Sequence, residues 1–201
     1  RDRDVTGVQT CALPISLGLA EFTLSRKDPH YVGLAKEVQK AEKAREADSC
    51  PLEAFPELEN AWKAMKEITP DADSRNTGIG STIFAVKPGD GSAREQAASC
   101  QKVLGGWANI ANEYATKRYR SNLINWGMLP FIIKEGELPF QNLDYLFIPG
   151  IRKAVEEKAP VIKAYVVGKG EKKEFDLTLG ELTDEERQII LKGCLINYNR
   201  V

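Results

Sequence analysis

The sequence contains few of the residues from which metal centres and nucleophilic sites are usually built. Its 201 residues include one histidine and four cysteines, and no two cysteines are spaced as C-x-x-C. Cys50, Cys100 and Cys194 are far apart in the chain, and Cys11 belongs to an unusual N-terminal segment. This usage fits neither a disulfide framework nor a zinc site and is typical of a reducing compartment. We therefore expect no metal site in the chain itself and a cytoplasmic location.

Long apolar runs and an excess of one charge are also missing. No apolar stretch approaches the roughly 18 residues that a membrane-spanning helix needs. Lys and Arg number 28 against 29 Asp and Glu, for a net charge of −1, whereas nucleic-acid binding calls for a clustered basic excess. We expect neither a membrane nor a nucleic acid as partner.

The N-terminal residues do not resemble the start of a natural protein. Methionine occurs only at Met65 and Met128, and Val5–Ile15 (VTGVQTCALPI) resembles the conceptual translation of a sequencing adapter. We interpret residues 1–16 as a non-native artefact, with a frayed native N-terminus as the alternative. The rest divides into a helical or linker segment, 17–74, and a domain, 75–201.

Local patterns predict an α/β fold. Helices are expected over Tyr31–Ala47, after the start signal Asp28-Pro29, and over Glu57–Glu67. Strands and helices then alternate, which predicts a parallel unit. The expected strands are Ser81–Val86, Trp107–Ala111 and Phe131–Ile133, and the expected helices are Ser92–Leu104 and Glu113–Trp126.

The C-terminal part has a different pattern. Ala159–Gly168 and Glu174–Leu179 are β-rich runs around a glycine turn, which predicts a hairpin. The last helix is expected to start at Thr183, because Thr183-x-x-Glu186 forms a capping box. The expected architecture is a small, mostly parallel sheet flanked by helices, with extra C-terminal strands.

One segment has the features of a ligand site. Residues 89–95 (GDGSARE) lie between a predicted strand and a predicted helix. The first N–H groups of a helix are unpaired and favour an anion, and Arg94 can hold a carboxylate with two parallel hydrogen bonds. A simpler alternative is that Ser92 and Glu95 form a capping box for the helix. The segment matches neither a Walker A loop nor G-x-G-x-x-G.

Three blocks together resemble the swivelling domain of the aconitase and isopropylmalate-isomerase superfamily. GDGSARE is similar to its G-x-G-S-S-R-E motif. Residues 122–130 resemble its N-L-x-x-x-G-x-L-P block, and residues 193–197 (GCLIN) resemble its C-terminal G-x-x-x-N element. The blocks occur in the family's order and cover roughly residues 81–201.

The resemblance implies a hydro-lyase that removes and re-adds water on a hydroxy-polycarboxylate. It implies Ser92 as the catalytic base, Arg94 as a catalytic residue that clamps a carboxylate and stabilises the alkoxide, and Gly91, Ser92, Ala93 and Arg94 as the substrate-binding loop. It also implies a [4Fe–4S] cluster bound by preceding domains, or by a large subunit, because none of the cysteines matches the family's ligands. We expect this chain to be inactive alone.

Some features leave alternatives open. Ala93 stands where the family usually has a second serine, and Gln96 where histidine is frequent, which puts citrate-like specificity in doubt. The chain could instead be the small subunit of a two-chain isomerase, or a ligand-binding or regulatory module that has lost catalysis. The basic run at residues 117–120 (KRYR) could contact substrate or the missing domains, or be a solvated helix face. Cys100, at helical spacing from apolar residues, is expected in the core.

Overall fold

The computed structural model describes residues 17–26, 28–168 and 172–200, so the predicted artefact 1–16 lies outside the described residues. The helices are α1 (Leu17–Ser25), α2 (Pro29–Glu46), α3 (Pro51–Ala54), α4 (Glu59–Ile68), α5 (Arg94–Val103), α6 (Lys117–Asn125), α7 (Ile151–Glu156), α8 (Asp184–Leu191) and α9 (Leu195–Tyr198), with a 3-10 helix η2 (Pro56–Leu58). The strands are β1 (Ser81–Ala85), β2 (Gly106–Ala111), β3 (Leu129–Ile132), β4 (Tyr145–Phe147), β5 (Ile162–Val167) and β6 (Lys173–Leu177). No helix in these ranges is long and apolar enough to cross a membrane.

The strands form two sheets of three. β1, β2 and β3 are parallel and lie in that order, whereas β4, β5 and β6 are antiparallel. Ile132 and Thr178 exchange two backbone hydrogen bonds, of 2.7 and 3.0 Å, and so join the sheets. The predicted α/β class is confirmed, and the extra C-terminal strands form a sheet of their own.

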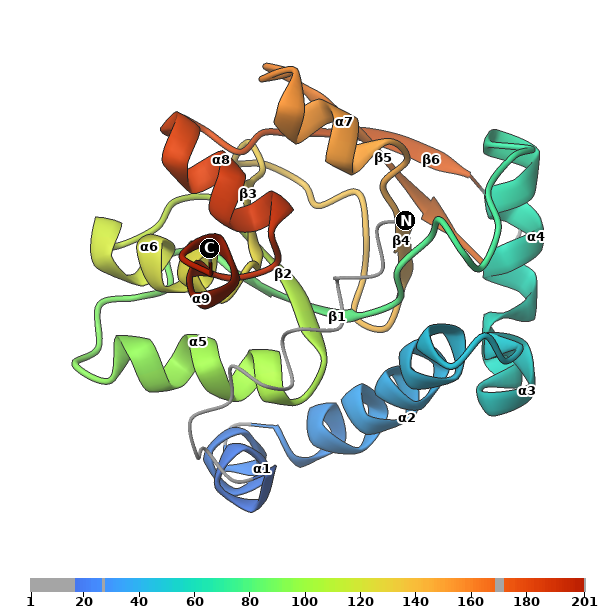
Figure 1. Ribbon diagram of the computed structural model, residues 1–201, viewed down its shortest axis with the longest axis horizontal. Helices are drawn as coiled ribbons and strands as arrows, with labels where there is room; N and C mark the ends of the chain where they lie inside the picture. Colours follow the sequence, from blue (N-terminus) through green and yellow to red (C-terminus); the bar gives the residue numbers. More distant parts are fainter. Residues whose placement is uncertain (1–16, 27, 169–171, 201) are drawn as a thin grey trace.

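The parallel sheet lies between two layers (Figure 1). Ala108 and Ile110 of β2 join a core that contains side chains from β3, β5 and β6, among them Phe131, Ile162 and Leu177. Asn109 lies between them in sequence and hydrogen-bonds to Tyr119 of α6 instead, as expected where successive side chains point to opposite faces. Helices α5 and α6 therefore cover one face and the antiparallel sheet covers the other.

The N-terminal helices pack against both halves of this structure. Ala20 of α1 and Val32 of α2 share a core with Cys100 and Leu104 at α5, while α4 packs on β4 and β5. Cys100 is fully buried, so its predicted place in the core is confirmed. The segment 17–68 thus covers the domain rather than trailing from it, as the course of α1, α2 and α4 in Figure 1 shows.

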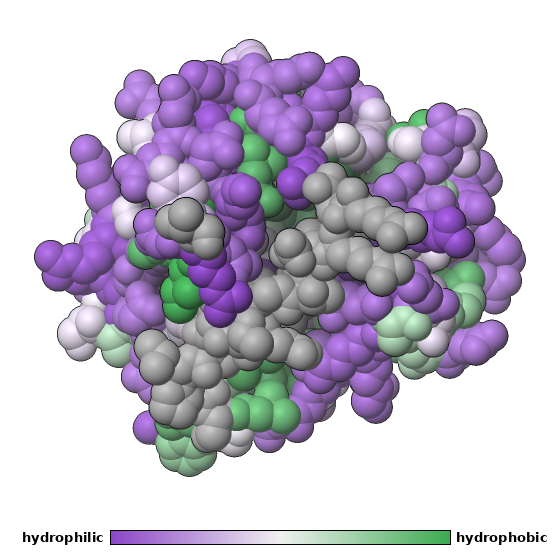
Figure 2. All heavy atoms as spheres, in the orientation of Figure 1, coloured by the Kyte–Doolittle hydropathy of each residue, from purple (hydrophilic) through white to green (hydrophobic). Residues whose placement is uncertain are grey.

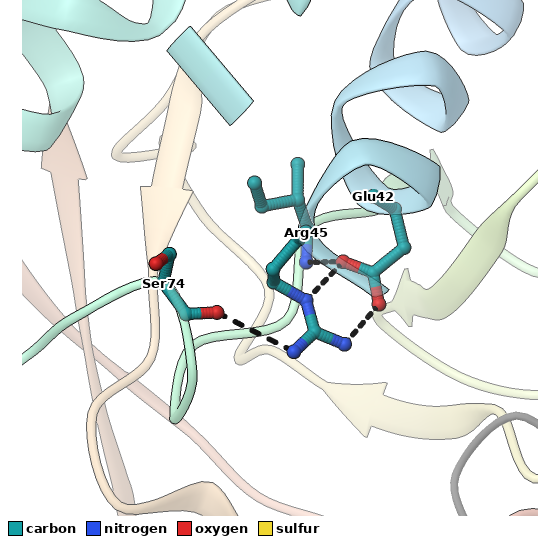
Figure 3. Close-up of polar contacts among 4 residues, drawn as sticks. Glu42, Arg45 and Ser74 are labelled. Atoms are coloured by element: carbon teal, nitrogen blue, oxygen red, sulfur yellow. Dashed lines mark hydrogen bonds and ion pairs between the residues drawn. The ribbon is translucent and has the colours of Figure 1, made fainter. Parts of the chain in front are cut away.

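A buried ion pair fixes α2 to the chain that enters β1 (Figure 3). Glu42 is 6% exposed, and its carboxylate accepts hydrogen bonds from Nε and Nη2 of Arg45, both at 2.7 Å. The same carboxylate accepts from the Ile79 N–H at 2.8 Å, and Nη1 of Arg45 donates to the Ser74 carbonyl at 3.4 Å. A buried charge with this many partners is well compensated. The pair thereby holds residues 74–79, which lead into β1, against α2.

The surface over α7 and α8 is charged. Exposed ion pairs join Lys153 to Glu157 at 3.7 Å and Lys158 to Asp184 at 2.6 Å. The corresponding region at the top of Figure 2 is mostly hydrophilic. Exposed pairs of this kind add little to stability, so we read this surface as a solvated one.

Most of the predicted elements are confirmed, with shifted ends. Asp28 caps α2 by accepting from the His30 and Tyr31 N–H groups at 2.9 and 3.2 Å, and the capping box at Thr183 is present. The helices α1, α3, α7 and α9 and the strand β4 were not predicted. Of these, α3, α7, α9 and β4 have only three to six residues, which carry too little periodicity. The hairpin β5–β6 is confirmed, although residues 169–171 of its turn lie outside the described residues.

One predicted helix began too early. The helix expected over Glu113–Trp126 is α6, Lys117–Asn125. The N–H groups of Asn112, Glu113 and Ala115 instead donate to carbonyls of the loop that follows β1. This loop-to-loop pairing is a tertiary contact that local propensity does not contain. The boundary at 74/75 stays a prediction.

Candidate functional site

The predicted anion loop lies at the carboxyl end of the parallel sheet, where β1 turns into α5. Because parallel strands end at one edge, the loop after β2 lies beside it, as is common for ligand sites in α/β sheets. The Asn112 and Glu113 N–H groups donate to the Val86 carbonyl at 3.2 and 3.1 Å, and the Ala115 N–H donates to Pro88 at 2.9 Å. The loop after β2 therefore fixes the backbone of residues 86–88 through these hydrogen bonds.

The two glycines of the loop have different roles. Gly89 has φ +102°, a conformation that favours glycine, and a Cβ there would lie 2.5 Å from Cβ of Tyr119. Around Gly91 a Cβ would meet no described atom within 4 Å, and its φ is not positive. The fold thus requires Gly89, whereas nothing in the described chain requires Gly91. Among the described residues, none fills the space next to Gly91.

Ser92 is exposed and lies just outside α5, which begins at Arg94 with Ala93 at its N-cap position. The helix has no side-chain cap from that position. Ser92 makes no side-chain hydrogen bond to any of the described residues. The alternative in which Ser92 caps the helix is therefore wrong.

A residue from a different motif block caps α5. The Asn122 side-chain amide is assigned in the orientation that satisfies both of its ends: its oxygen accepts from the Glu95 N–H at 3.1 Å and its nitrogen donates to Glu95 Oε2 at 3.2 Å. Trp126 Nε1 donates to Glu95 Oε1 at 2.6 Å. Glu95 is thus tied to α6, and Ser92 has no structural task in the cap.

Arg94 is partly buried and held by the loop backbone. Nε donates to the Gly89 carbonyl at 3.0 Å, and Nη2 donates to the Asp90 carbonyl at 3.4 Å. Within the described ranges Nη1 has no partner. One edge of the guanidinium is therefore fixed, while donors on its other side are left for a ligand. No hydrogen bond joins Arg94 to Ser92 in the part of the chain that the structure describes.

The three motif blocks meet in space. Asn122 and Trp126 of the second block contact Glu95 of the first. Gly127, with φ +67°, approaches the third block so closely that a Cβ would lie 1.8 Å from the Gly193 carbonyl oxygen. Much of the motif pattern therefore encodes packing that supports the 89–95 loop, in which residues 90–93 and Glu95 are exposed and Arg94 is partly buried.

The two halves of the basic run at residues 117–120 lie in different environments, the first exposed and the second packed against the domain. Lys117 and Arg118 are exposed, as in the solvated-face alternative. Tyr119 is 3% exposed, and Nη2 of Arg120 donates to the Leu179 and Glu181 carbonyls at 2.8 and 2.7 Å. The second half of the run thus joins α6 to the loop after β6.

Sequence reasoning missed a polar network beneath the loop. The Tyr119 hydroxyl accepts from Gln101 Nε2 at 3.0 Å and from Asn109 Nδ2 at 2.9 Å, and burial raises its pKa. Burial also raises the pKa of Tyr114, whose hydroxyl lies 3.0 Å from the Phe131 carbonyl. Both phenols therefore keep their protons, and their hydroxyl groups serve as structural hydrogen-bonding groups rather than as bases. A polar Asn109 inside an otherwise apolar strand was the signal available in the sequence.

The described residues do not supply a metal site. They contain no group of three or more His, Cys, Asp or Glu side chains placed to hold an ion. Cys50 is exposed, whereas Cys100 and Cys194 are buried in the fold. These residues do not fit a [4Fe–4S] cluster.

Comparison with known families identifies the chain. A sequence model of the family described as the aconitase C-terminal domain matches residues 33–136, which is more than half of the 201 residues. The chain belongs to the aconitase C-terminal domain family. The match begins inside α2 and runs past the end of β3, so it covers the candidate loop at residues 89–95.

Individual relatives agree with this membership. The chain is 30% identical over 146 residues to aconitate hydratase A of Rickettsia bellii (strain RML369-C), and 29% identical over 146 residues to that of Rickettsia felis (strain ATCC VR-1525 / URRWXCal2). Each alignment covers 69% of this chain and 16% of the relative. The chain therefore spans about a sixth of the length of these curated relatives.

Among solved structures, the 3-isopropylmalate dehydratase of Methanocaldococcus jannaschii DSM2661 matches 72% of this chain and 81% of its own, with 23% identity and a TM-score of 0.39. The predicted resemblance to the aconitase superfamily is confirmed by the family match. The general reaction class of the relatives is that of hydratases. The roles of Ser92, Arg94, Gly91 and Ala93 stay predictions.

Proposed function

We propose that this chain is the substrate-closing C-terminal domain of a hydro-lyase that dehydrates and rehydrates a hydroxy-polycarboxylate. One observation carries the proposal. The loop at the start of α5 exposes Ser92 and the outer edge of Arg94, while Asn122 supplies the helix cap that Ser92 would otherwise have made. Dehydration of a hydroxy acid needs a base next to a carboxylate-binding group. Ser92, which makes no capping hydrogen bond, and Arg94, which has unoccupied N–H donors, fit these two roles.

Ser92 is the proposed base. Removing water from a hydroxy acid requires a base for the proton on the carbon next to a carboxylate, while the hydroxyl group leaves from the adjacent carbon. A serine hydroxyl is a poor base unless its alkoxide is stabilised. The N-terminus of α5 and the Arg94 guanidinium supply positive potential there.

Arg94 is the proposed carboxylate clamp. Its Nε is occupied by the Gly89 carbonyl, so a carboxylate would be held by the terminal nitrogens. Two parallel hydrogen bonds from one planar group fix both the position and the orientation of a carboxylate. A Cβ at Gly91 would meet no described atom within 4 Å, and Ala93 is exposed. These two small residues would leave space for a substrate beside this clamp.

The iron–sulfur centre of the proposed enzyme belongs to a part of the protein outside this chain. Its preceding domains, or a large subunit, would hold the [4Fe–4S] cluster, and the polycarboxylate would bind between them and the 89–95 loop. On this proposal the chain is inactive alone, and the complete enzyme is cytoplasmic.

Two alternatives make different predictions. In a two-chain enzyme the cluster-bearing large subunit is encoded separately, and this chain would co-purify with it. In a ligand-binding or regulatory module, tricarboxylates would bind but the complete protein would not turn over. Ala93, in place of the family's usual serine, is the residue that favours the module.

Arg94→Lys in the complete enzyme tests the proposal. Lysine keeps the charge but cannot form two parallel bonds, and it cannot reach the Gly89 carbonyl while also binding substrate. We expect kcat/KM to fall by roughly 10²–10³-fold, the size seen when a transition-state donor is removed. Arg152→Lys, an equivalent change in an exposed ion pair on α7, is the control. Equal activities for the two variants would rule out the clamp.

A further inference from the structure

We propose that Thr116 is a positioning residue that fixes the Arg94 guanidinium through the Gly89 carbonyl. The Thr116 hydroxyl donates to this carbonyl at 2.9 Å, and Nε of Arg94 donates to the same oxygen at 3.0 Å. The functional meaning of this contact rests on the proposed role of Arg94. The contact between Thr116, Gly89 and Arg94 does not depend on that role, because these two hydrogen bonds define it.

The shared acceptor makes the two residues interdependent. A carbonyl oxygen has two lone pairs, and here each has one donor. Gly89 is also fixed by packing, because it lies so close to the Tyr119 side chain that a Cβ would be 2.5 Å from Cβ of Tyr119. Thr116 and Tyr119 come from the same end of α6, so α6 fixes both the position of Gly89 and the direction of its carbonyl.

Thr116 is also the N-cap of α6, since Oγ1 accepts from the Tyr119 N–H at 3.2 Å. The hydroxyl therefore performs two tasks: it accepts at the helix and donates to the loop. The other contacts between the two loops are backbone bonds and an exposed ion pair between Lys87 and Glu113 at 2.8 Å. Thr116 is thus a side chain through which the contact at the Gly89 carbonyl can be altered without breaking the backbone pairing.

Loss of the hydroxyl should release Arg94 rather than unfold the domain. With Thr116→Val, the Gly89 carbonyl keeps Arg94 as partner but can rotate with the loop. A displacement of about 1 Å in a catalytic group can cost roughly 10²-fold in rate. We expect kcat/KM of the complete enzyme to fall by roughly 10- to 100-fold, with Thr116→Ser restoring it because serine has the same hydroxyl.

Two further variants separate positioning from capping. Thr183 caps α8 in the same way, by accepting from the Glu186 N–H at 3.1 Å, and belongs to a different loop. Thr183→Val should leave kcat/KM unchanged. Thr116→Asp keeps the cap of α6, because aspartate is a strong N-cap, but a carboxylate cannot donate to Gly89. It should lose activity as Thr116→Val does.

A second measurement does not depend on turnover. Phenylglyoxal reacts with arginine side chains, and peptide mass spectrometry of the complete protein gives the rate at Arg94. We expect Thr116→Val to speed modification of Arg94 several-fold and Thr183→Val to leave it unchanged. Unchanged Arg94 reactivity in Thr116→Val, or wild-type kcat/KM in Thr116→Asp, would overturn the positioning role. If Arg94→Lys retains activity while Thr116→Val still speeds Arg94 modification, the proposed function fails but the contact between Thr116, Gly89 and Arg94 stands.

Discussion

At the scale of single residues, Gly89 and Gly91 illustrate how one motif combines a structural and a functional requirement. Gly89 has a backbone conformation that side chains disfavour and lies against Tyr119. Gly91 has neither constraint within the described chain. The motif G-x-G does not distinguish the two glycines, whereas the structure shows that the fold constrains only Gly89 of the two.

Matched alanine substitutions test this separation. Gly89→Ala should lower the free energy of unfolding by about 2–4 kcal/mol, from left-handed backbone strain and the clash with Tyr119. Gly91→Ala should change it by less than about 0.5 kcal/mol, and should impair only catalysis or substrate binding. Urea denaturation of both variants gives the comparison. Similar losses of stability for the two would show that Gly91, too, is required by the fold.

Ala93 is the clearest departure from the family pattern at this scale. It takes the N-cap position of α5 with φ −87° and ψ 49°, exposed and without a capping side chain. The resemblance implies that the serine usually present there helps to bind substrate. The position lies beside Ser92 and Arg94, where a difference of one hydroxyl would act on substrate choice and leave the fold intact.

At the scale of elements, the contact between α5 and α6 explains why the motif blocks occur together. Asn122 of α6 accepts from the Glu95 N–H at 3.1 Å and so caps α5 from outside its own sequence. Such a cap is invisible to a search for Ser, Thr, Asp or Asn at the N-cap position. The S-x-x-E pattern at residues 92–95 suggested that Ser92 caps α5. That alternative is wrong, because the capping oxygen comes from Asn122.

Asn122→Ala tests the cap from α6. We expect the free energy of unfolding to fall by about 1–2 kcal/mol, because the Glu95 N–H at the start of α5 loses its side-chain partner. The Glu95 carboxylate loses one donor and keeps Trp126 Nε1 as the other. Chemical denaturation measures this, with the exposed Asn142→Ala as control. If the two variants are equally stable, Asn122 does not cap α5.

The strand and helix order of the parallel unit could be predicted because it follows from local periodicity and glycine turns. The start of α6 could not, since residues 112–115 pair with the loop after β1 instead of forming a helical turn. The short helix α7 likewise depends on burial of Val155 against the sheets. For the candidate site, Ser92 and Arg94 were predicted from the motif, whereas the contacts of Thr116 with Gly89 and of Asn122 with Glu95 follow no spacing along the chain.

At the scale of the whole molecule, the N-terminal helices are integral to the fold. α1 and α2 pack on α5, α4 packs on the antiparallel sheet, and the buried pair of Glu42 and Arg45 fixes the path into β1. The family match also begins at residue 33, inside α2. At the carboxyl edge of the parallel sheet, residues 90–93 and Glu95 are left exposed, where the proposed function places the substrate.

Turnover of the complete enzyme carrying Ser92→Ala tests the central claim most directly. Ser92 is exposed and caps nothing, so the variant should fold as the wild type does. We expect hydration and dehydration of the polycarboxylate to slow by roughly 10²–10⁴-fold, the contribution of a positioned general base, with the exposed Ser49→Ala unaffected. Near-normal turnover of a folded Ser92→Ala enzyme would contradict the account and leave the 89–95 loop as a binding element without a catalytic base.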